Sequence, residues 1–524
     1  MNDAAAQPFS TQRPGVDFDR FRLRRFLESL EPDQLQTRTD PVDLADVAAV
    51  LEGNPCAVLF RRVGPEAGEL AGNVNGSRAR LARAFEVPPD RLVAELLRRS
   101  KMQPEIVEVS GKEAPVQQVV LTGADADLTR LPVHLQHGVD GSLYISDSID
   151  YTIDPKTGWT NVGMRRLMLR GAKEAGVDLV APSDLRAIYE AAAARGENLP
   201  VSFVVGSHPI DHVAATMRMA VDELGLVASL RGAPLPVVKS VTSDIRVPAD
   251  AEWVLEGYFD PRGHVEPEGP YGEFLGYYGA VKRNPLFHLT AITRRRDALF
   301  QTATIGGRTM GCTDTAQLVA LRSEAVVWQA LQTAVREPLA VYCTTASGGA
   351  FNVRVALRQR APGEARNAVA AVFGCQINAK NVFVVDPDID VFSDAQIDWA
   401  LATRFQPDRD LIVLGGFRTL PLDPSLPGGG RVGAKAGFDL TWPFGAAGRL
   451  ETSIPEPPRF VGKRFASVQA ALEDGPKHFE ELMAALGSRD GREVVRALDA
   501  LRAEPGLERD ERGCYLLGGK AKHS

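Results

Sequence analysis

The feature that most constrains the fold is a change of pattern along the chain. Strand patterns dominate from about residue 143 to residue 304, beginning with residues 143–146 and 148–153. After Gly311, helical and strand patterns alternate instead, which is typical of a sheet covered by helices. At 524 residues, the chain is long enough for two to four domains. The change of pattern therefore predicts different architectures in successive domains.

The patterns predict an α+β chain with four parts. Residues 1–127 combine helical and strand patterns, which indicates a small N-terminal α/β domain, with a first helix expected over residues 17–30. Residues 128–312 form the β-rich part, and residues 313–457 form a second α/β domain. Residues 464–524 carry two amphipathic helical faces and a turn near Gly513, so we expect a small, helical, winged-helix-like tail.

Two helices are expected to interrupt the β-rich part. The first begins at Pro182-Ser183-Asp184 and is closed by Gly196. The second covers most of residues 211–230. The position of Asp184 also fits a helix N-cap, a purely structural role.

Composition excludes several classes of function. The net charge of −7 lacks the basic footprint of a nucleic-acid-binding protein. No apolar run is long enough for a membrane span, and residues 1–15 lack the apolar core of a signal peptide, so a cytoplasmic location is expected. The five cysteines are scattered without a Cys-x-x-Cys pair, which favours reduced thiols over a zinc ribbon.

Two carboxylates flank a turn at Glu268-Gly-Pro-Tyr-Gly-Glu273, and aromatic and apolar residues follow at once. A water-poor pocket raises the pKa of a carboxyl group and a neighbouring cation lowers it. One of the two acids is then able to stay protonated while the other stays charged. The structural alternative is an exposed turn with two solvated acids.

The sequence lacks the common nucleotide and hydrolase motifs. No Gly-x-Gly-x-x-Gly follows a strand, and neither a Walker-type loop nor a Gly-x-Ser-x-Gly elbow occurs. The remaining polar candidates have structural alternatives: Arg166 as a surface or ion-pairing residue, and Glu223 on a solvated helix face.

Several motifs, in their order, resemble the UbiD-type decarboxylase family. The resemblance covers about residues 128–442, is weaker in the N-terminal part, and omits the tail. The motifs that carry it are Asn161-x-x-x-x-Arg166, Pro236-Val-Val-Lys239, Val247-Pro-Ala249, Glu268-Gly-Pro-Tyr-Gly-Glu273, Asp386-x-Asp388-Ile-Asp390-Val391, Trp399-Ala400 and Thr403-Arg404.

The resemblance implies a flavin-reductase-like split β-barrel in the middle of the chain and a C-terminal domain that mediates oligomerisation. It implies prenylated FMN, supplied by a flavin prenyltransferase and held through Mn²⁺ or Mg²⁺ and K⁺. The implied reaction is the reversible, non-oxidative decarboxylation of an aromatic, heteroaromatic or α,β-unsaturated acid, with an aromatic acyl-CoA as an alternative substrate. A homodimer or homohexamer is implied, without nucleic acid or membrane.

Matched by position, Arg166, Glu268 and Glu273 resemble the catalytic group of the family, with Glu273 as the proton donor. Asn161, Asp184 and Glu223 resemble its metal ligands, although relatives usually carry His at the position of Asp184. Aspartate binds hard cations through oxygen, so Mg²⁺ or Mn²⁺ still fits. The implied cofactor-binding residues are Asn161, Val162, Gly163, Met164, Arg165, Arg166, Ser183, Glu223 and Lys435.

Two other functions remain open at this point. One is a binding or assembly subunit that keeps the fold without the chemistry, and the joint presence of Arg166, Glu268 and Glu273 argues against it. The other is an ordinary FMN reductase, which has no support in the sequence beyond the implied barrel.

Overall fold

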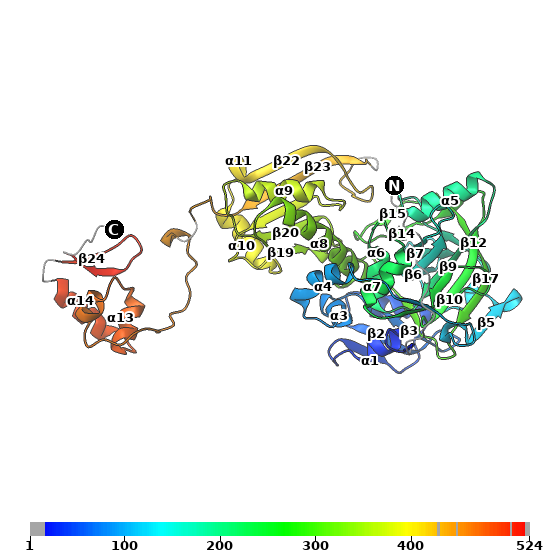
Figure 1. Cartoon of the computed structure of the whole chain (residues 1–524), viewed down its shortest axis with the longest axis horizontal. Coiled ribbons are helices and arrows are strands. Elements are labelled where there is room, and N and C mark those ends of the chain that lie inside the picture. Colours follow the sequence, from blue (N-terminus) through cyan, green and yellow to red (C-terminus); the bar gives the residue numbers. More distant parts are fainter. Residues whose placement is uncertain (1–15, 427–429, 447–448, 503–505, 519–524) are drawn as a thin grey trace. The chain divides into compact units, whose positions relative to one another are not determined.

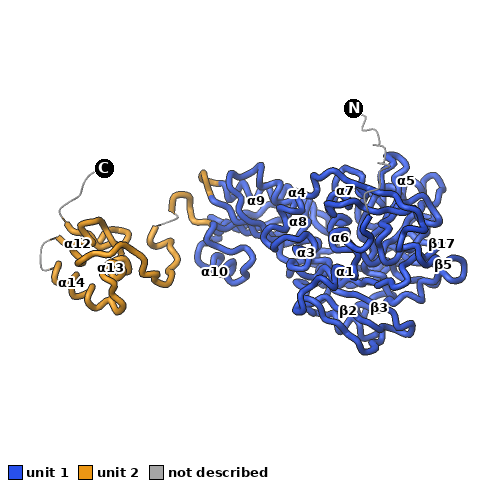
Figure 2. The backbone as a smooth tube through the Cα atoms, turned by 60° about the horizontal axis from the view of Figure 1, so that its bottom comes forward, with its two compact units in different colours: residues 1–358, 364–440 blue, residues 359–363, 441–524 orange. Residues whose placement is uncertain are grey.

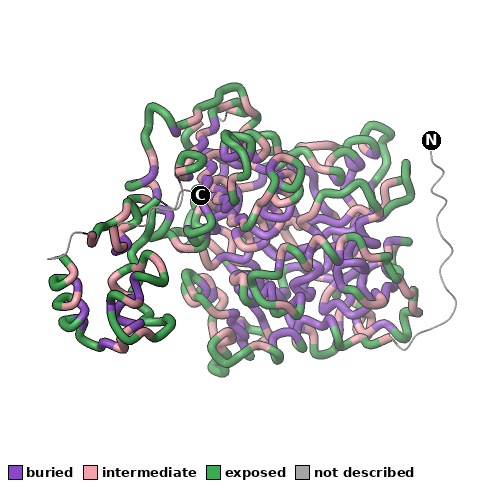
Figure 3. Tube along the Cα trace, turned by 60° about the vertical axis from the view of Figure 1, so that its left-hand side comes forward, coloured by how far each residue is buried: buried purple, intermediate pink, exposed green. Residues whose placement is uncertain are grey.

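A computed structural model describes residues 16–426, 430–446, 449–502 and 506–518. The prediction that the first fifteen residues carry no signal peptide falls outside these ranges. The chain has two compact units, one of residues 1–358 and 364–440 and one of residues 359–363 and 441–524 (Figure 2). Buried segments run through the interior of the larger unit, and exposed segments lie at its surface (Figure 3).

The larger unit contains a closed antiparallel barrel built from the β-rich part of the sequence (Figure 1). Its strands follow in the order β12, β9, β6, β7, β8 and β17, and β17 pairs with β12 to close it. The predicted α+β fold with a central barrel is therefore confirmed. The six strands are β6 (Tyr144–Ile153), β7 (Thr160–Leu169), β8 (Glu174–Val177), β9 (Leu199–Val205), β12 (Trp253–Phe259) and β17 (Leu286–Arg294).

Aromatic rings and one glycine explain how this barrel closes. The ring of Phe203 meets the edges of Phe287 and Phe259, with centroids 5.0 and 6.2 Å apart. The register between β12 and β17 shifts after Glu256, at Gly257. A Cβ atom at Gly257 would lie 2.0 Å from the carbonyl oxygen of His288. Glycine thus permits the close backbone approach that a bulge in this strand pair requires.

Three helices in this part of the chain are α5 (Asp184–Ala194), α6 (Pro209–Thr216) and α7 (Glu223–Arg231). The single helix expected over residues 211–230 is instead divided into α6 and α7. The side chain of Asp222 accepts the N–H groups of Leu224 and of Thr160 on β7. This cap starts α7 beside the barrel and brings Glu223 to the wall formed by β7.

The N-terminal part forms a four-stranded sheet in the order β1, β2, β3 and β18. Its last strand comes from the end of the β-rich part and pairs in parallel with β3. Strands β4 (Ile106–Glu108), β10 (Leu235–Lys239) and β11 (Arg246–Pro248) form a separate sheet. The remaining elements are β1 (Leu35–Arg38), α2 (Val47–Leu51), β2 (Ala57–Val63), β3 (Gly68–Gly72), α3 (Arg78–Ala84), α4 (Leu92–Arg99), β5 (Val119–Thr122) and β18 (Phe300–Thr302).

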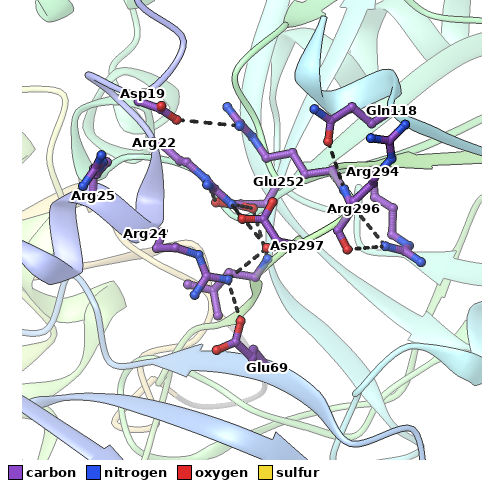
Figure 4. Close-up of polar contacts among 12 residues, drawn as sticks. Asp19, Arg22, Arg24, Arg25, Glu69, Gln118, Glu252, Arg294, Arg296 and Asp297 are labelled. Carbon is purple, nitrogen blue, oxygen red and sulfur yellow. Dashed lines mark hydrogen bonds and ion pairs between the residues drawn. The ribbon is translucent and has the colours of Figure 1, made fainter.

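An ion-pair network fixes the first helix to the barrel (Figure 4). Helix α1 covers Leu23–Glu28 rather than the predicted residues 17–30, because the Asp17 side chain accepts two backbone N–H groups and forms a turn before it. The guanidinium of Arg22 pairs with Glu252 at 3.0 Å and with Asp297 at 2.9 Å. Because Glu252 is fully buried, this pairing satisfies a charge that would otherwise destabilise the fold.

Residues 313–440 form the expected alternation of helices and strands. The sheet order is β19, β20, β21, β23 and β22, with β22 at one edge. The elements are α8 (Asp314–Ala334), β19 (Pro338–Cys343), β20 (Asn352–Leu357), α9 (Glu364–Gly374), β21 (Asn381–Val385), α10 (Asp394–Arg404), α11 (Pro407–Asp410), β22 (Leu411–Arg418) and β23 (Val432–Leu440).

The smaller unit contains helices and one hairpin around its own apolar core, which includes Leu482, Val494 and Tyr515. Its elements are α12 (Val468–Glu473), α13 (Phe479–Leu486), α14 (Arg492–Arg502), β24 (Leu507–Arg509) and β25 (Tyr515–Leu517). In the described part of the chain, no helix combines the length and apolar character that crossing a membrane requires.

Candidate active site

The turn between Glu268 and Glu273 carries both carboxylates to one arginine of the barrel wall. Glu268 ends β13 (Glu266–Glu268), and Glu273 follows β14 (Tyr271–Gly272). Arg166 on β7 donates from Nε to Glu268 Oε1 at 3.0 Å and from Nη1 to Glu273 Oε2 at 3.3 Å. The structure therefore brings together the three predicted catalytic side chains.

This acid–arginine–acid group is almost closed to solvent. Glu268 is fully buried and Glu273 is 6% exposed. The amide of Asn284 donates to Glu268 Oε2 at 3.2 Å. Burial alone would lower the pKa of Arg166, but the charges of Glu273, Glu268 and Asp178 hold it well above its ordinary value. Arg166 is therefore a permanent cation that orders the carboxylates around it.

Two charged residues near this group were missed by sequence reasoning. Asp178 follows β8 and accepts from Arg166 Nη2 at 2.9 Å and from Lys282 Nζ at 3.2 Å. Lys282 begins β16 (Lys282–Asn284) and stands directly opposite Glu268 in the pairing of β13 with β16. A hairpin register drawn through the turn would have predicted this cross-strand pair.

Aromatic rings cover the same group. The Cζ atom of Arg166 lies 4.4 Å from the ring centroid of Tyr271, and the ring of Tyr144 is 4.4 Å from that of Tyr271. Burial, followed by the charge of Glu268, raises the pKa of Tyr144. The hydroxyl of Tyr271 donates to Gln136 Oε1 at 2.5 Å. Both tyrosines stay neutral and contribute apolar surface beside the carboxylates.

Asn161, Asp184 and Glu223 come from β7, α5 and α7 and line one cavity of about 910 Å³. Asn161 Nδ2 and the backbone N–H of Val162 both donate to Glu223 Oε2 at 2.6 Å. Burial raises the pKa of Glu223 to about 7, and the charges of Asp150 and Asp184 add to this rise. The three predicted metal ligands thus lie together. The raised pKa of Glu223 means that the surrounding side chains do not fully compensate its negative charge.

An orphaned oxygen supports a cation at this position. Asn161 Oδ1 is buried without a hydrogen-bond partner, and a buried polar atom of this kind needs one. Two carboxylates and an amide oxygen are ligands for a hard cation such as Mg²⁺ or Mn²⁺. Among the described residues, no group of three His, Cys, Asp or Glu side chains is arranged to hold a metal ion, so a cation between Asp184 and Glu223 would need Asn161 as a further ligand.

The other predicted cofactor-binding residues divide into two groups. Arg165 Nη2 lies 3.3 Å from Ser183 Oγ, which places a cation against the hydroxyl that precedes Asp184 at the start of α5. At Gly163, a Cβ atom would lie 2.9 Å from Asp150 Oδ1, so a larger residue would have to displace this carboxylate where β7 passes it. Lys435 is not part of this cluster. It lies on β23 in another sheet, where its amine donates to the carbonyl of Phe373 at 2.9 Å.

The structure also corrects the alternative role of Asp184. Ser183, not Asp184, is the N-cap of α5, and its hydroxyl accepts the N–H of Arg186 at 3.2 Å. Asp184 is the first residue of the helix and is exposed. Its carboxylate therefore does not cap the helix, and Asp184 lines the same cavity as Glu223.

A barrel wall that carries an acid–arginine–acid group and three oxygen side chains is suited to binding carboxylates and to transferring protons. Comparison with known sequences agrees. Residues 31–100, 107–309 and 316–440 match, in turn, the N-terminal, Rift-related and C-terminal domains of 3-octaprenyl-4-hydroxybenzoate carboxy-lyase, the UbiD models. The chain belongs to the UbiD family, and the predicted carboxy-lyase class is confirmed.

Two solved structures of UbiD-class enzymes are similar to this chain. The UbiD-class enzyme HmfF from Pelotomaculum thermopropionicum, in complex with FMN, is 32% identical, with a TM-score of 0.78 over 83% of this chain and 97% of that one. An evolved dimeric form of HmfF, in complex with prFMN, is 30% identical, with a TM-score of 0.75 over the same shares.

Several curated relatives, including the two that follow, are decarboxylases by name. The anhydromevalonate phosphate decarboxylase of Aeropyrum pernix is 33% identical over 72% of this chain and 83% of its own length. The phenolic acid decarboxylase of a Streptomyces species is 29% identical over 83% and 94%.

Proposed function

We propose that the protein catalyses the reversible, non-oxidative decarboxylation of an aromatic or heteroaromatic acid with prenylated FMN. The observation that carries this proposal is the position of Arg166 between Glu268 and Glu273, because it unites a carboxylate-binding cation with a buried acid. A binding or assembly subunit would have no need for this group.

The donors beside the barrel suit a phosphorylated flavin. Asn161, Asp184 and Glu223 would hold Mg²⁺ or Mn²⁺ against the phosphate, and Arg165 and Ser183 would bind the phosphate itself. K⁺ is proposed as a second cation, from the family resemblance alone. When bound, the prenylated flavin would supply the sink for the electron pair that the departing CO₂ leaves on the substrate carbon.

The side chains of the chain perform the remaining tasks. Arg166 orients the carboxylate of the substrate or of Glu268 through paired hydrogen bonds. Glu273 donates the proton that replaces CO₂ on carbon and takes one up in the reverse direction. Tyr144 and Tyr271 exclude water from this group, which strengthens its electrostatic interactions.

The substrate class is proposed from relatives. HmfF is a UbiD-class enzyme studied with FMN and prFMN, and the Streptomyces relative acts on phenolic acid. There are two alternative substrates. One is an acid such as anhydromevalonate phosphate, after which the Aeropyrum relative is named, and the other is an aromatic acyl-CoA.

The test compares protein produced with and without a flavin prenyltransferase. Bound cofactor is identified by mass spectrometry, and CO₂ release is measured over a panel of aromatic, heteroaromatic and unsaturated acids. We expect turnover only with prenylated FMN. Equal turnover in cofactor-free protein, or none on any acid with the loaded protein, would refute the proposal.

A homo-oligomer is proposed as the working form. The edge strand β22 exposes Val413 and Leu414, and the neighbouring strand exposes Val432. Apolar side chains on an edge strand favour pairing with another chain. In a homodimer or homohexamer, a second copy of the chain would cover this edge.

A further inference from the structure

Lys282 makes a contact with Glu273 that the proposed function does not use. Its Nζ atom lies 3.5 Å from Glu273 Oε1 and 3.2 Å from Asp178 Oδ2. The pairing of β13 with β16 holds Lys282 opposite Glu268, so its side chain reaches Glu273 from a paired strand. Glu273 is therefore placed between two cations, Arg166 and Lys282.

Asp178 anchors Lys282 and links it to Arg166. One of its oxygens accepts from both cations, and the other accepts the backbone N–H of Val180 at 3.0 Å. Burial would raise the pKa of Asp178, but Arg166 and Lys282 hold it below its ordinary value. Asp178 is therefore a stable anion that fixes the direction of the lysine side chain.

The charges explain why a second cation is needed. When Glu273 gives up its proton, a carboxylate is left in a site where its side chain is 7% exposed. A buried carboxylate is costly unless it is paired. Arg166 is already shared with Glu268 and Asp178. Lys282, with a side chain only 22% exposed, supplies a further positive charge at contact distance.

We propose that Lys282, anchored by Asp178, is a positioning residue that holds Glu273 and stabilises the carboxylate formed when it protonates the substrate carbon. This inference rests on the proposed function. For each CO₂ released, one proton passes from Glu273 to carbon and one returns to Glu273 from water. Lys282 keeps its own proton throughout, so the balance needs no further reactant.

Three substitutions test the role of the charge. Lys282→Met removes it at similar size, and Lys282→Arg keeps it. Arg283→Met is the matched control, because Arg283 is the exposed next residue on β16 and donates to the carbonyl of Val265. In the loaded enzyme, Lys282→Met should slow CO₂ release and solvent-deuterium incorporation by about tenfold, part of the 10²–10⁴-fold typical of acid–base groups.

KM for the acid and cofactor content should not change in Lys282→Met, and the solvent isotope effect on kcat should rise. Lys282→Arg should recover most of the rate, and Arg283→Met should keep it. Asp178→Asn, which removes the anchor but leaves Lys282 and Glu273, should show a smaller loss of the same kind. A full rate in Lys282→Met would overturn the inference while the proposed function stands.

A second measurement does not depend on activity. Melting temperatures of the cofactor-free protein are compared for Lys282→Met, Glu273→Gln and the double variant. Because the two side chains are in contact, the shift of the double variant should differ from the sum of the single shifts. Additive shifts would overturn the inference. A loaded wild-type enzyme that releases no CO₂ would instead refute the proposed function.

Discussion

Asn161 and Glu223 are 62 residues apart in the chain, yet the amide nitrogen of one lies 2.6 Å from a carboxylate oxygen of the other. Strand β7 presents Asn161, and the first turn of α7 presents Glu223. The amide oxygen is left without a partner in a cavity that Asp184 also lines. The pair therefore leaves one buried oxygen for the cation that we propose at this position.

We predict that Asp184→Asn weakens divalent-metal binding by at least about tenfold, since it removes one of two charged ligands. Metal content and flavin content are measured after exhaustive dialysis. Glu190→Gln is the matched comparison, because it removes an exposed acid of the same helix that pairs with Arg186 and should leave the bound metal and flavin unchanged. Stoichiometric metal in Asp184→Asn would place the ligands elsewhere.

We predict that Glu273→Gln abolishes turnover and leaves cofactor binding intact. Glutamine keeps the size and hydrogen-bonding capacity of the side chain but has no dissociable proton. Loss of a positioned acid should slow CO₂ release by roughly 10²–10⁴-fold or more. Rates of CO₂ release and of deuterium incorporation are compared at equal flavin content, and wild-type values in the variant would remove Glu273 from the reaction.

We predict a pH-dependent stability that originates at His208. Burial, followed by the repulsion of nearby Arg231 and His212, lowers the pKa of His208 to about 3, although Asp211 acts in the opposite direction. The ring packs against Phe21 and Phe26. The unfolded state binds a proton below about pH 6.5 and the folded state does not, so folding should weaken by up to about 1.4 kcal/mol per unit as pH falls from 6.5 toward 3.

His208→Asn provides the test, because asparagine keeps the cap on α6 without a titrating ring. Free energies of unfolding from urea titrations are compared at several pH values between 4 and 8. The variant should be less stable at pH 8, where packing is lost, and its stability should fall less steeply toward acid. The same change at the exposed His478, also a helix N-cap, is the control. Equal slopes in wild type and His208→Asn would contradict the prediction.

Periodicity and turn residues were enough to predict the α+β class, the β-rich centre and the alternating second half. They did not predict the break between α6 and α7, because helical propensity continues through residues 217–222. The break comes from a tertiary contact, the hydrogen bond from Thr160 on β7 to the side chain of Asp222. Local sequence does not contain that information.

The order of the motifs along the chain predicted that Arg166, Glu268 and Glu273 act together. In the structure, Arg166 contacts both carboxylates. Asp178 and Lys282 were missed because neither belongs to a motif and their role follows from hairpin register. The resemblance implied that Lys435 lies near the cofactor phosphate, and the structure places it on β23, in a different sheet from Asn161 and Arg166.

We predict that Val413→Lys converts the proposed oligomer to a smaller species. Val413 is 59% exposed on the edge strand β22, and a lysine there opposes pairing between edges. Light scattering after gel filtration gives the mass, and circular dichroism checks the fold. Val495→Lys, at a residue 55% exposed in the smaller unit, should leave the mass unchanged. An unaltered mass in Val413→Lys would exclude this edge from the interface.

We predict that a chain ending at Pro457 retains cofactor and activity. The apolar core of the tail is drawn from residues 465–517, so the tail has the means to fold by itself. The family match ends at residue 440, and HmfF is covered over 97% of its length by 83% of this chain. Flavin content, turnover and mass are compared with those of the full chain. Because the barrel and its site lie within residues 144–294, we expect equal flavin and equal kcat. Loss of both flavin and oligomer on truncation would show that the tail belongs to the catalytic body.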